Sequence, residues 1–415
     1  MNYENKTVAI VGAGIVGCSC ALWMQKKGFK VVLIDPEEPG SGTSSGNACT
    51  IADYGCIPVN NPALIKRLPS LLFSANSPLS LKPGYVLTHL PWMISFLRNC
   101  SPPKVAHITR ALGELLAKTY AGLDPLLEMA DARDLLKQQG CLHVYEKEAE
   151  FQAAAITNQI RREHGASFEA VNSGEIAELE PHLKPIFTGG YLFDKASQVL
   201  NPKTLVNRYF ECLMRNQGEY IPAKAVEVKQ DNDSINLLLD NGGNLLVDRV
   251  VIAAGAFSRD IKGSGAQLLP LDTERGYHVQ YRDLQHLLNR PVSWNEAGFY
   301  ATPMNEGLRL AGTVEIAGYG KSKNPRNLNY LHRKGAEMLD LPVAADSDWL
   351  GFRPSFPDAL PVIGYSPMSE QILLAFGHQH LGLTLAGITG KLIAELANEE
   401  SSGHNLTPFS PGRFL

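Results

Sequence analysis

The segment TVAIVGAGIVGCSCALWMQKKGFKVVLID at residues 7–35 constrains the fold of this chain more than any other segment. It contains an apolar strand, a glycine turn, a helix and a second apolar strand. Gly12 allows a tight turn, Gly14 leaves room for phosphates, and Gly17 lets the helix pack on the strand. Short apolar runs of this kind are typical of a parallel sheet buried on both faces. The segment therefore predicts a βαβ unit that binds a dinucleotide at the start of its helix.

A carboxylate follows the glycine turn at the spacing that dinucleotide-binding units use. Asp35 ends the second strand, 18 residues after Gly17, where it can accept hydrogen bonds from ribose hydroxyls. Its charge would repel a 2′-phosphate, which argues against NADP. The glycine turn and the acid together leave both NAD and FAD open as the ligand.

Three further features favour FAD. Ala21 extends the glycine motif with a small residue, which lets the helix approach the sheet closely. The polar segment GTSSGNA at 42–48 supplies hydroxyl and amide groups for phosphates and a ring edge, with a solvated loop as the alternative. The apolar run VVIAAGAFS at 250–258 ends in Ala-Gly, where the backbone can approach the ligand a second time.

Near the other end of the chain, GHQHLGLTLAGITG at 377–390 predicts a glycine-flanked loop followed by a helix. Gly382, Ala386 and Gly390 lie four residues apart and form a smooth strip for close packing against neighbouring backbone. We expect the start of this helix to face the ligand, because a helix N-terminus stabilises negative charge.

Composition limits the class of protein. The 415 residues are enough for two domains, and 44% apolar with 19% charged residues is ordinary for a globular chain. The net charge of −4 gives no electrostatic basis for binding nucleic acid. Seven scattered cysteines without a CxxC pair favour reduced thiols in a cytoplasmic protein and argue against a metal site.

The sequence predicts no membrane-spanning segment and leaves only contact with a membrane surface open. The sequence has no run of about 18 uncharged apolar residues, so a membrane span is not expected. The amphipathic stretch PWMISFLRNC at 91–100 leaves open a peripheral contact on the inner face of a membrane. A helix that covers a core is the favoured alternative for this stretch.

The order of elements predicts two interleaved domains. Material of the βαβ type lies at both ends and near 201–260, strand-rich blocks lie between, and 56–135 is mostly helical with a mobile loop at 74–84. We therefore predict an α/β fold combined with an antiparallel sheet. The Rossmann-type nucleotide-binding domain is assigned 1–55, 195–265 and 348–415, and an inserted α+β substrate domain is assigned 56–194 and 266–347.

These segments together resemble a known family. The glycine segment, GTSSGNA, DTERGYH at 272–278, GFRPSFPDALPVIG at 351–364 and AFGHQHLGLTLAGITG at 375–390 are similar to the FAD-dependent D-amino acid oxidase superfamily. Within it, the chain most resembles bacterial D-amino acid dehydrogenases of the D-hydroxyproline dehydrogenase type. The resemblance implies a flavoprotein that binds extended FAD and lays an antiparallel sheet over the flavin. The last segment lacks the cysteine to which covalent sarcosine oxidases attach their flavin, which implies noncovalent FAD.

The motifs and the resemblance together predict FAD contacts from both ends and from the middle of the chain. Asp35 stands where glutamate is commoner in this superfamily, and Cys49 takes a position often held by glycine. The residues predicted to bind FAD are Gly12, Gly14, Ile15, Val16, Gly17, Asp35, Thr43, Ser44, Ser45, Asn47, Ala48, Val226, Ala254, Gly255, Gly377, His378, Gly382, Leu383 and Thr384.

The resemblance also implies two-electron oxidation of an α-amino acid at Cα. Arg353 in GFRPS corresponds to the arginine that binds the substrate carboxylate, and a planar guanidinium can hold a carboxylate with two hydrogen bonds. A structural ion pair is the alternative role for this arginine. The other residues predicted at the substrate or flavin edge are Tyr277, His278, Tyr300 and His380, with Tyr54 as a weaker candidate.

Each of these aromatic residues has a structural alternative, such as a place in the core or on the sheet surface. Glu274, Arg275 and Glu315 could form a charge pair at the substrate chamber, but we expect them on a solvated face.

The sequence thus predicts an enzyme that oxidises a D-amino acid, with D-proline or hydroxy-D-proline as examples. Its partners would be this small molecule and an electron acceptor, quinone or oxygen, and the oligomeric state is not determined. Three alternatives stay open: a glycine or sarcosine oxidase, a non-catalytic flavin-binding subunit of a larger assembly, and an NAD-binding regulator that shares only the glycine motif.

Overall fold

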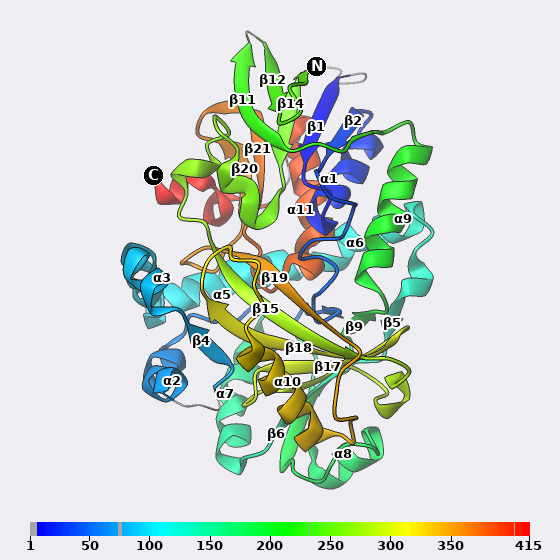
Figure 1. Cartoon of the computed structure of the whole chain (residues 1–415), viewed down its shortest axis with the longest axis vertical. Helices are drawn as coiled ribbons and strands as arrows, with labels where there is room; N and C mark the ends of the chain where they lie inside the picture. Colours follow the sequence, from blue (N-terminus) through cyan, green and yellow to red (C-terminus); the bar gives the residue numbers. More distant parts are fainter. Residues whose placement is uncertain (1–5, 74–76, 232, 402) are drawn as a thin grey trace.

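The computed structural model describes residues 6–73, 77–231, 233–401 and 403–415. One part of the molecule contains a mostly parallel sheet with both ends of the chain, and the other contains a large, mostly antiparallel sheet (Figure 1). The chain crosses between the two parts several times, so each is built from segments distant in sequence.

The first part is organised by a six-stranded sheet in the order β10-β2-β1-β14-β21-β20. All neighbours are parallel except β20 and β21, which are antiparallel. On β1 the fully buried Val8 and Ile10 belong to one core, whereas Ala9 and Val11 belong to another, which confirms a sheet buried on both faces. The strands are β1 (Thr7–Val11), β2 (Lys30–Ile34), β10 (Glu219–Ile221), β14 (Arg249–Ile252), β20 (Val362–Ser366) and β21 (Ser369–Phe376).

Helices cover one face of this sheet. A Cβ added to Gly390 in α11 would lie 2.7 Å from the backbone of Ser19 in α1, and one added to Gly387 would lie 2.6 Å from the backbone of Gly122 in α6. The small residues thus allow close packing of helix backbones. The predicted strip is confirmed at Gly390, whereas Gly387 lies outside that strip and a Cβ on Gly382 would meet only the His378 Cβ at 3.8 Å. The helices of this layer are α1 (Ile15–Lys26), α6 (Thr119–Met129), α9 (Pro202–Arg215) and α11 (Gly382–Ala397).

A small antiparallel sheet covers the opposite face. Its strands contribute Ile235, Leu237 and Val247 to the same core as Val250 and Ile252 of β14. Its strands are β11 (Ala225–Asp231), β12 (Ser234–Leu239) and β13 (Asn244–Val247).

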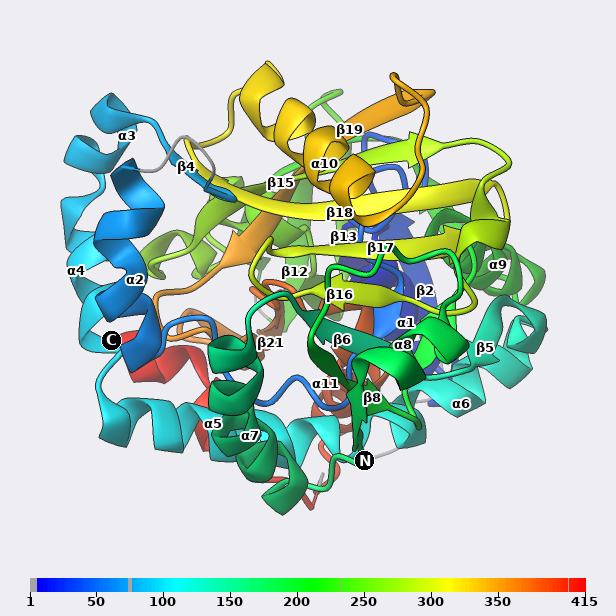
Figure 2. The ribbon, with the colours of Figure 1, turned by 90° about the horizontal axis from the view of Figure 1, so that it is seen from below.

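The second part is built on a nine-stranded sheet in the order β19-β15-β18-β17-β16-β6-β8-β7, with β4 also paired to β18. Figure 2 shows its central strands side by side, with α10 (Pro325–Met338) across one face. The strands are β4 (Leu79–Leu81), β6 (Cys141–Tyr145), β7 (Glu169–Asn172), β8 (Gly189–Phe193), β15 (Asp272–Tyr281), β16 (Val292–Trp294), β17 (Phe299–Met304), β18 (Gly307–Ile316) and β19 (Ser347–Ser355).

Shorter elements connect and cover the two parts. A three-stranded sheet is formed by β3 (Thr50–Ile51), β9 (Ser197–Val199) and β5 (Leu136–Gln138). The remaining α-helices are α2 (Pro62–Phe73), α3 (Pro83–Thr88), α4 (Leu90–Arg98), α5 (Pro102–Leu116), α7 (Glu148–Glu163) and α8 (Ser173–Leu179). The 3-10 helices are η1 (Arg133–Leu135), η2 (Gly255–Asp260), η3 (Ala266–Leu268), η4 (Gln285–Leu287), η5 (Thr407–Phe409) and η6 (Pro411–Phe414).

The helical character predicted for 56–135 is confirmed by α2 to α6. The loop predicted at 74–84 is only partly tested, because 74–76 lie outside the described residues, and 79–81 form strand β4 instead. The stretch 91–100 forms most of α4, in which no residue is fully buried. This helix therefore covers a core only in part.

The six-stranded sheet takes two strands from each of the ranges 1–55, 195–265 and 348–415. Strand β19 lies in the last of these ranges but pairs with β15 in the large sheet. The exact boundaries between the two domains stay a prediction.

Candidate active site

A cavity of about 750 Å³ lies where the two parts of the molecule meet. Its lining comes from the glycine turn after β1, the segment between β2 and α2, the end of β14, strands β17 to β19, and the loop before α11. The first and last segments of the chain therefore line one cavity, together with the large sheet.

The glycine turn has no room for side chains. Gly12 has a φ of +111°, and a Cβ there would lie 2.5 Å from the Ala253 carbonyl oxygen. A Cβ on Gly17 would lie 1.8 Å from the Gly12 oxygen. Helix α1 begins at Ile15, whose N–H donates to Ser44 Oγ at 2.9 Å. The turn thus brings strand, helix and the 42–48 segment into contact at the edge of the cavity.

Asp35 supports the same turn. Its carboxylate accepts from the Ala13 N–H at 2.7 Å and from the Glu37 N–H at 2.9 Å. Burial raises the pKa of this carboxyl above its ordinary value, although the two backbone hydrogen bonds partly oppose that shift. Because the residue also lines the cavity, the carboxylate can both hold the turn and accept from a ligand hydroxyl.

Residues of the large sheet hold the polar segment 42–48 in place. Arg309 of β18 donates from Nη1 to the Ser45 oxygen at 2.8 Å and to the Asn47 oxygen at 3.1 Å. Thr43 Oγ1 donates to the Phe352 oxygen at 2.9 Å, and Asn47 Nδ2 donates to the Ser44 oxygen at 2.8 Å. Many polar groups of the 42–48 segment therefore form hydrogen bonds within the loop or to the large sheet.

The loop before α11 contains two histidines with different surroundings. His378 is buried, and its Nε2 lies 2.9 Å from Thr389 Oγ1 within α11. Burial lowers the pKa of this imidazole to about 4, so it is neutral at pH 7. His380 Nε2 lies 3.2 Å from Glu274 Oε2, and its imidazole is 40% exposed. His378 therefore stabilises the helix, whereas His380 presents an acid-paired imidazole to the cavity.

Arg353 lies on β19 with its guanidinium across the large sheet. Its Nη1 donates to the Thr313 oxygen at 2.9 Å and its Nη2 to the Gly312 oxygen at 3.5 Å. Burial lowers its pKa, and the nearby Glu274 opposes that effect. For Glu274, burial opposes ionisation, but His380 and Arg353 outweigh it and bring the pKa of this carboxyl below its ordinary value. The cavity wall thus contains the Arg353 guanidinium together with a buried counter-charge, Glu274.

Comparison with known proteins places this site in a family. Residues 7–396 match the family described as FAD dependent oxidoreductase. The chain is an FAD-dependent oxidoreductase of this family. It is 32% identical to the D-amino-acid oxidase of Bradyrhizobium diazoefficiens over 99% of this chain and 100% of that protein. It is 24% identical to the D-amino acid dehydrogenase of Helicobacter pylori over 96% of this chain and 97% of that protein.

Solved structures show the same fold. Glycine oxidase from Geobacillus kaustophilus superposes with a TM-score of 0.76 at 21% identity, covering 98% of each chain. L-proline dehydrogenase from P. horikoshii superposes with a TM-score of 0.72 at 16% identity, covering 99% of this chain and 98% of that one. The predicted fold class and superfamily are confirmed, and FAD is the cofactor.

The cavity of this oxidoreductase fits FAD at its nucleotide end. The closed glycine turn, the start of α1 and the carboxylate of Asp35 form a cradle for a pyrophosphate and a ribose. Most residues predicted to bind FAD line the cavity: Gly12, Gly14, Ile15, Val16, Asp35, Thr43, Ser44, Asn47, Ala48, Ala254, Gly255, His378, Gly382 and Leu383. Their individual contacts with FAD stay predictions.

Five other residues predicted to bind FAD do not line this cavity. Gly17 lies beneath the turn, Gly377 packs on the Phe356 ring, and Thr384 Oγ1 accepts from the Ala52 N–H at 2.9 Å. Ser45 lines a separate polar cavity of about 250 Å³, and Lys224 and Ala225 line the main cavity in place of Val226. These five residues support the lining from behind or lie beside it.

Of the residues predicted at the substrate side, the oxidoreductase brings Arg353, Tyr300 and His380 to the cavity, but not Tyr277 or His278. Neighbouring residues on a strand point to opposite faces, so Tyr277 faces α10 and donates to Glu315. His278 stacks on Trp349 and hydrogen-bonds the Gly46 oxygen at 3.1 Å. Burial and the nearby Arg309 lower the pKa of His278 to about 3, so it is a neutral structural group.

The prediction of a solvated face for Glu274, Arg275 and Glu315 is wrong. Their exposed fractions are 5%, 5% and 6%, and Arg275 Nη1 lies 3.0 Å from Glu315 Oε2. They are buried because β15 and β18 lie inside the large sheet, covered by α10 on one face and by the cavity wall on the other. Charged residues in a buried strand must pair, and these do.

Several cavity residues carry no motif that marks them in the sequence. Thr313 has a φ of +57°, which is strained for a β-branched residue and places its carbonyl on Arg353. His143 Nε2 lies 3.4 Å from the Tyr54 hydroxyl and 3.5 Å from the Tyr300 hydroxyl. Arg161 of α7 lies beside this group and lines the same cavity. Only the fold brings these separate segments together.

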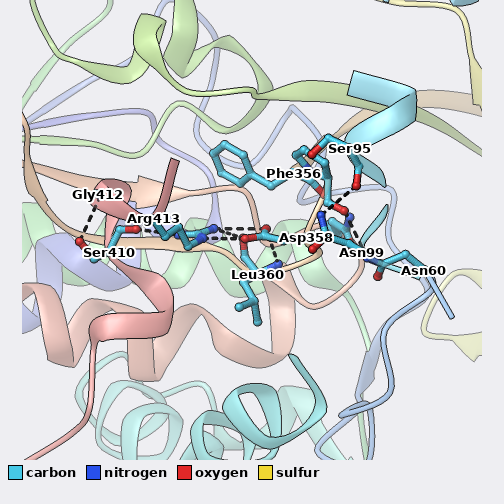
Figure 3. A network of polar contacts seen from close by, with 11 residues as sticks. Asn60, Ser95, Asn99, Phe356, Asp358, Leu360, Ser410, Gly412 and Arg413 are labelled. Carbon is cyan, nitrogen blue, oxygen red and sulfur yellow. Dashed lines mark hydrogen bonds and ion pairs between the residues drawn. The ribbon is translucent and has the colours of Figure 1, made fainter. Parts of the chain in front are cut away.

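The C-terminal tail holds the turn between β19 and β20 (Figure 3). Arg413 donates to Asp358 Oδ2 at 2.7 Å and to the Leu360 oxygen at 2.7 Å. These contacts fix the turn after β19, and Phe356 in that turn fills the space beside Gly377. The tail thereby positions the segment that presents His380.

Proposed function

We propose that this oxidoreductase removes two electrons from Cα of a free D-amino acid whose carboxylate binds Arg353. The observation that carries the proposal is that this half-buried guanidinium lines the same cavity as the FAD cradle. Relatives named D-amino-acid oxidase and D-amino acid dehydrogenase, each aligned over nearly the whole chain, support the D-amino acid class. Noncovalent FAD supplies the hydride acceptor when it is bound.

Arg353 and the His380–Glu274 pair have defined parts in this proposal. Arg353 holds the carboxylate bidentately and thereby selects which Cα hydrogen faces the ring. Its hydrogen bonds to two backbone carbonyls hold the guanidinium in place before substrate arrives. The amine must lose a proton before hydride leaves, and His380 can accept it, because Glu274 at 3.2 Å stabilises the imidazolium. The product imine either hydrolyses to a keto acid or stays cyclic.

A narrower form of the proposal concerns cyclic substrates. D-proline and hydroxy-D-proline are included because the motifs resemble the D-hydroxyproline dehydrogenase type. The imine of a cyclic substrate would keep its ring. Quinone and oxygen are both candidate electron acceptors.

Anaerobic reduction of the flavin tests the proposal. Purified holoenzyme is mixed with D- and L-alanine, D-proline, the hydroxyproline isomers, glycine and sarcosine, and loss of the flavin absorbance is followed over time. We expect D-isomers to bleach the flavin much faster than L-isomers. Fastest bleaching by glycine or sarcosine would instead favour an amine oxidase, a class supported by the glycine oxidase fold neighbours. No bleaching by any compound would indicate a non-catalytic flavin subunit.

We also propose a cytoplasmic protein that contacts the inner face of a membrane through α4 and its surroundings. The described helices include none long and apolar enough to cross a membrane. Helix α4 lies at one edge of the molecule (Figure 2). Its Leu90, Ile94 and Leu97 are 45%, 47% and 38% exposed. Residues 54–113 contain six Lys or Arg and no Asp or Glu, which suits an anionic lipid surface.

Sedimentation with lipid vesicles tests this contact. We expect the holoenzyme to sediment with vesicles that contain phosphatidylglycerol but not with pure phosphatidylcholine. The Ile94→Ser, Leu97→Ser double variant should lose binding and keep its flavin. Equal sedimentation of the variant and the unmodified protein would contradict the assignment to α4.

A further inference from the structure

Arg161 is a cation of the cavity wall that lies several strands away from Arg353. Arg161 lies in the last turn of α7 and lines the main cavity together with Tyr54, His143 and Tyr300. Its Cζ lies 5.6 Å from the centre of the Phe193 ring, and that ring stacks on Tyr54 with centroids 4.1 Å apart. The guanidinium is therefore part of the chamber wall.

The charge of Arg161 is uncompensated within the described part of the chain. Its Nη1 donates to the neutral Asn158 Oδ1 at 2.6 Å, and no described carboxylate lies within 4.0 Å. Its Nε is buried without a partner, and Nη2 makes no hydrogen bond to a described residue. A guanidinium can donate five hydrogen bonds, and a half-buried one without an anion is costly.

Stabilisation of the C-terminal end of α7 does not explain why Arg161 faces the cavity. Arg162, the next residue in the same helix turn, is exposed and lies 4.2 Å from the Phe168 ring, away from the cavity. It can interact with the α7 dipole from the surface. Arg161 has the same position along the dipole but faces the chamber, where its charge helps to lower the pKa of the buried His143.

Arg353 and Arg161 line the same cavity at separate places on the large sheet. The Arg353 guanidinium bonds to the backbone of β18, whereas His143, beside Arg161, lies on β6. Strands β17 and β16 lie between these two strands, so three strand spacings separate them, or about 14 Å. That span accommodates a small substrate with a polar group at each end. The Tyr300 hydroxyl on β17 adds a further polar group to the wall between them.

We propose that Arg161 recognises an acceptor oxygen on the substrate's side chain, which a carboxylate or a ring hydroxyl would supply. This inference rests on the proposed function, because it assumes that the α-carboxylate binds Arg353. A carboxylate would use both the hydrogen bonds and the charge of Arg161, and a hydroxyl would use the hydrogen bonds alone. The substrate class is then D-amino acids with an oxygen-bearing side chain.

Matched substrate pairs test the inference. D-glutamate is compared with D-norvaline, and hydroxy-D-proline with D-proline, by kcat/KM for flavin reduction in the holoenzyme. We expect the oxygen-bearing member to be preferred by at least about ten-fold in one pair, as a charge-assisted hydrogen bond provides. The pair that shows the preference identifies the oxygen as carboxylate or hydroxyl.

Variants then assign the preference to one residue. Arg161→Met should remove it while kcat/KM for the member without oxygen stays near that of the unmodified enzyme. Arg162→Met, which loses the same charge from the same helix turn, should keep the preference. Flavin content and melting temperature of each variant show whether it is folded.

Three results would overturn the inference. These are no preference in either pair of the unmodified enzyme, a preference that survives in Arg161→Met, or an equal loss for both members of a pair. The last would mean that Arg161 binds the α-carboxylate. The comparison of substrate pairs uses the unmodified enzyme. The inference can therefore be refuted even if Arg161→Met does not fold. Failure of every D-amino acid to reduce the flavin would instead refute the proposed function itself.

Discussion

Gly276 on β15 allows a single methyl group to test the role of Arg353. An added Cβ would lie 2.3 Å from the Arg353 Cζ. Non-bonded carbon atoms approach to about 3.5 Å, so the guanidinium has to move by about 1.2 Å, which is 3.5 − 2.3. Gly276 does not have a positive φ, so alanine fits its backbone without strain.

Gly276→Ala should lower catalysis much more than it lowers folding stability. A displacement of about 1 Å in a substrate-positioning group can lower catalysis by about 100-fold, so kcat/KM for the best D-amino acid should fall by about that factor. The displaced atoms are the end of a flexible side chain, so overpacking should cost at the low end of about 1–3 kcal/mol. The variant should therefore be folded, yellow and nearly inactive.

Anaerobic flavin reduction and thermal unfolding measure these consequences on the same protein. Gly84→Ala is the matched control, because a Cβ there meets no atom within 4 Å. It should change neither quantity appreciably. If Gly276→Ala keeps kcat/KM within about three-fold of the unmodified enzyme, substrate positioning by Arg353 at its observed place is refuted. A variant that cannot retain FAD would show that the methyl group disturbs more than Arg353.

Three further changes have defined outcomes. Arg353→Ala should lower kcat/KM by at least about 100-fold with FAD still bound, and near-normal kinetics would exclude its role. Gly12→Ala should lower the flavin absorbance per protein, because its Cβ would lie 2.5 Å from the Ala253 oxygen at a φ of +111°; full FAD content would contradict this. His378 has its pKa lowered from 6.5 to about 4, so its contribution to stability is complete above pH 6.5 and is lost as the pH falls towards 4. The loss amounts to about 3 kcal/mol, so the melting temperature of His378→Gln should fall less between pH 7 and pH 4.5 than that of the unmodified protein.

The nucleotide end of the site could be predicted from sequence because its constraints are local. Gly12 is required by its own φ and by the carbonyl beside it, and Asp35 follows at a fixed spacing along one βαβ unit. The C-terminal helix was predictable for a similar reason, since small residues at helical spacing indicate close packing.

The substrate end could be predicted only in part. The family resemblance predicts Arg353, and the strand pattern predicts Tyr300. The strand pattern does not predict which face Tyr277 takes, because a bulge and the strand register decide which neighbour points inward. Glu274 and Arg275 look like surface charges in isolation. Their burial depends on helix α10 and on loop 378–382, which are distant in sequence.

Local sequence patterns are enough to predict the βαβ unit, the FAD family and the glycine positions, because periodicity and backbone sterics act within a few residues. The folded arrangement is needed to show that Arg309 holds the 42–48 segment, that His380 pairs with Glu274, and that Arg161 shares a cavity with Arg353. Each of these arrangements joins residues that are more than 100 positions apart. They are set by strand register and by the packing of α7 against the large sheet, which no local pattern specifies.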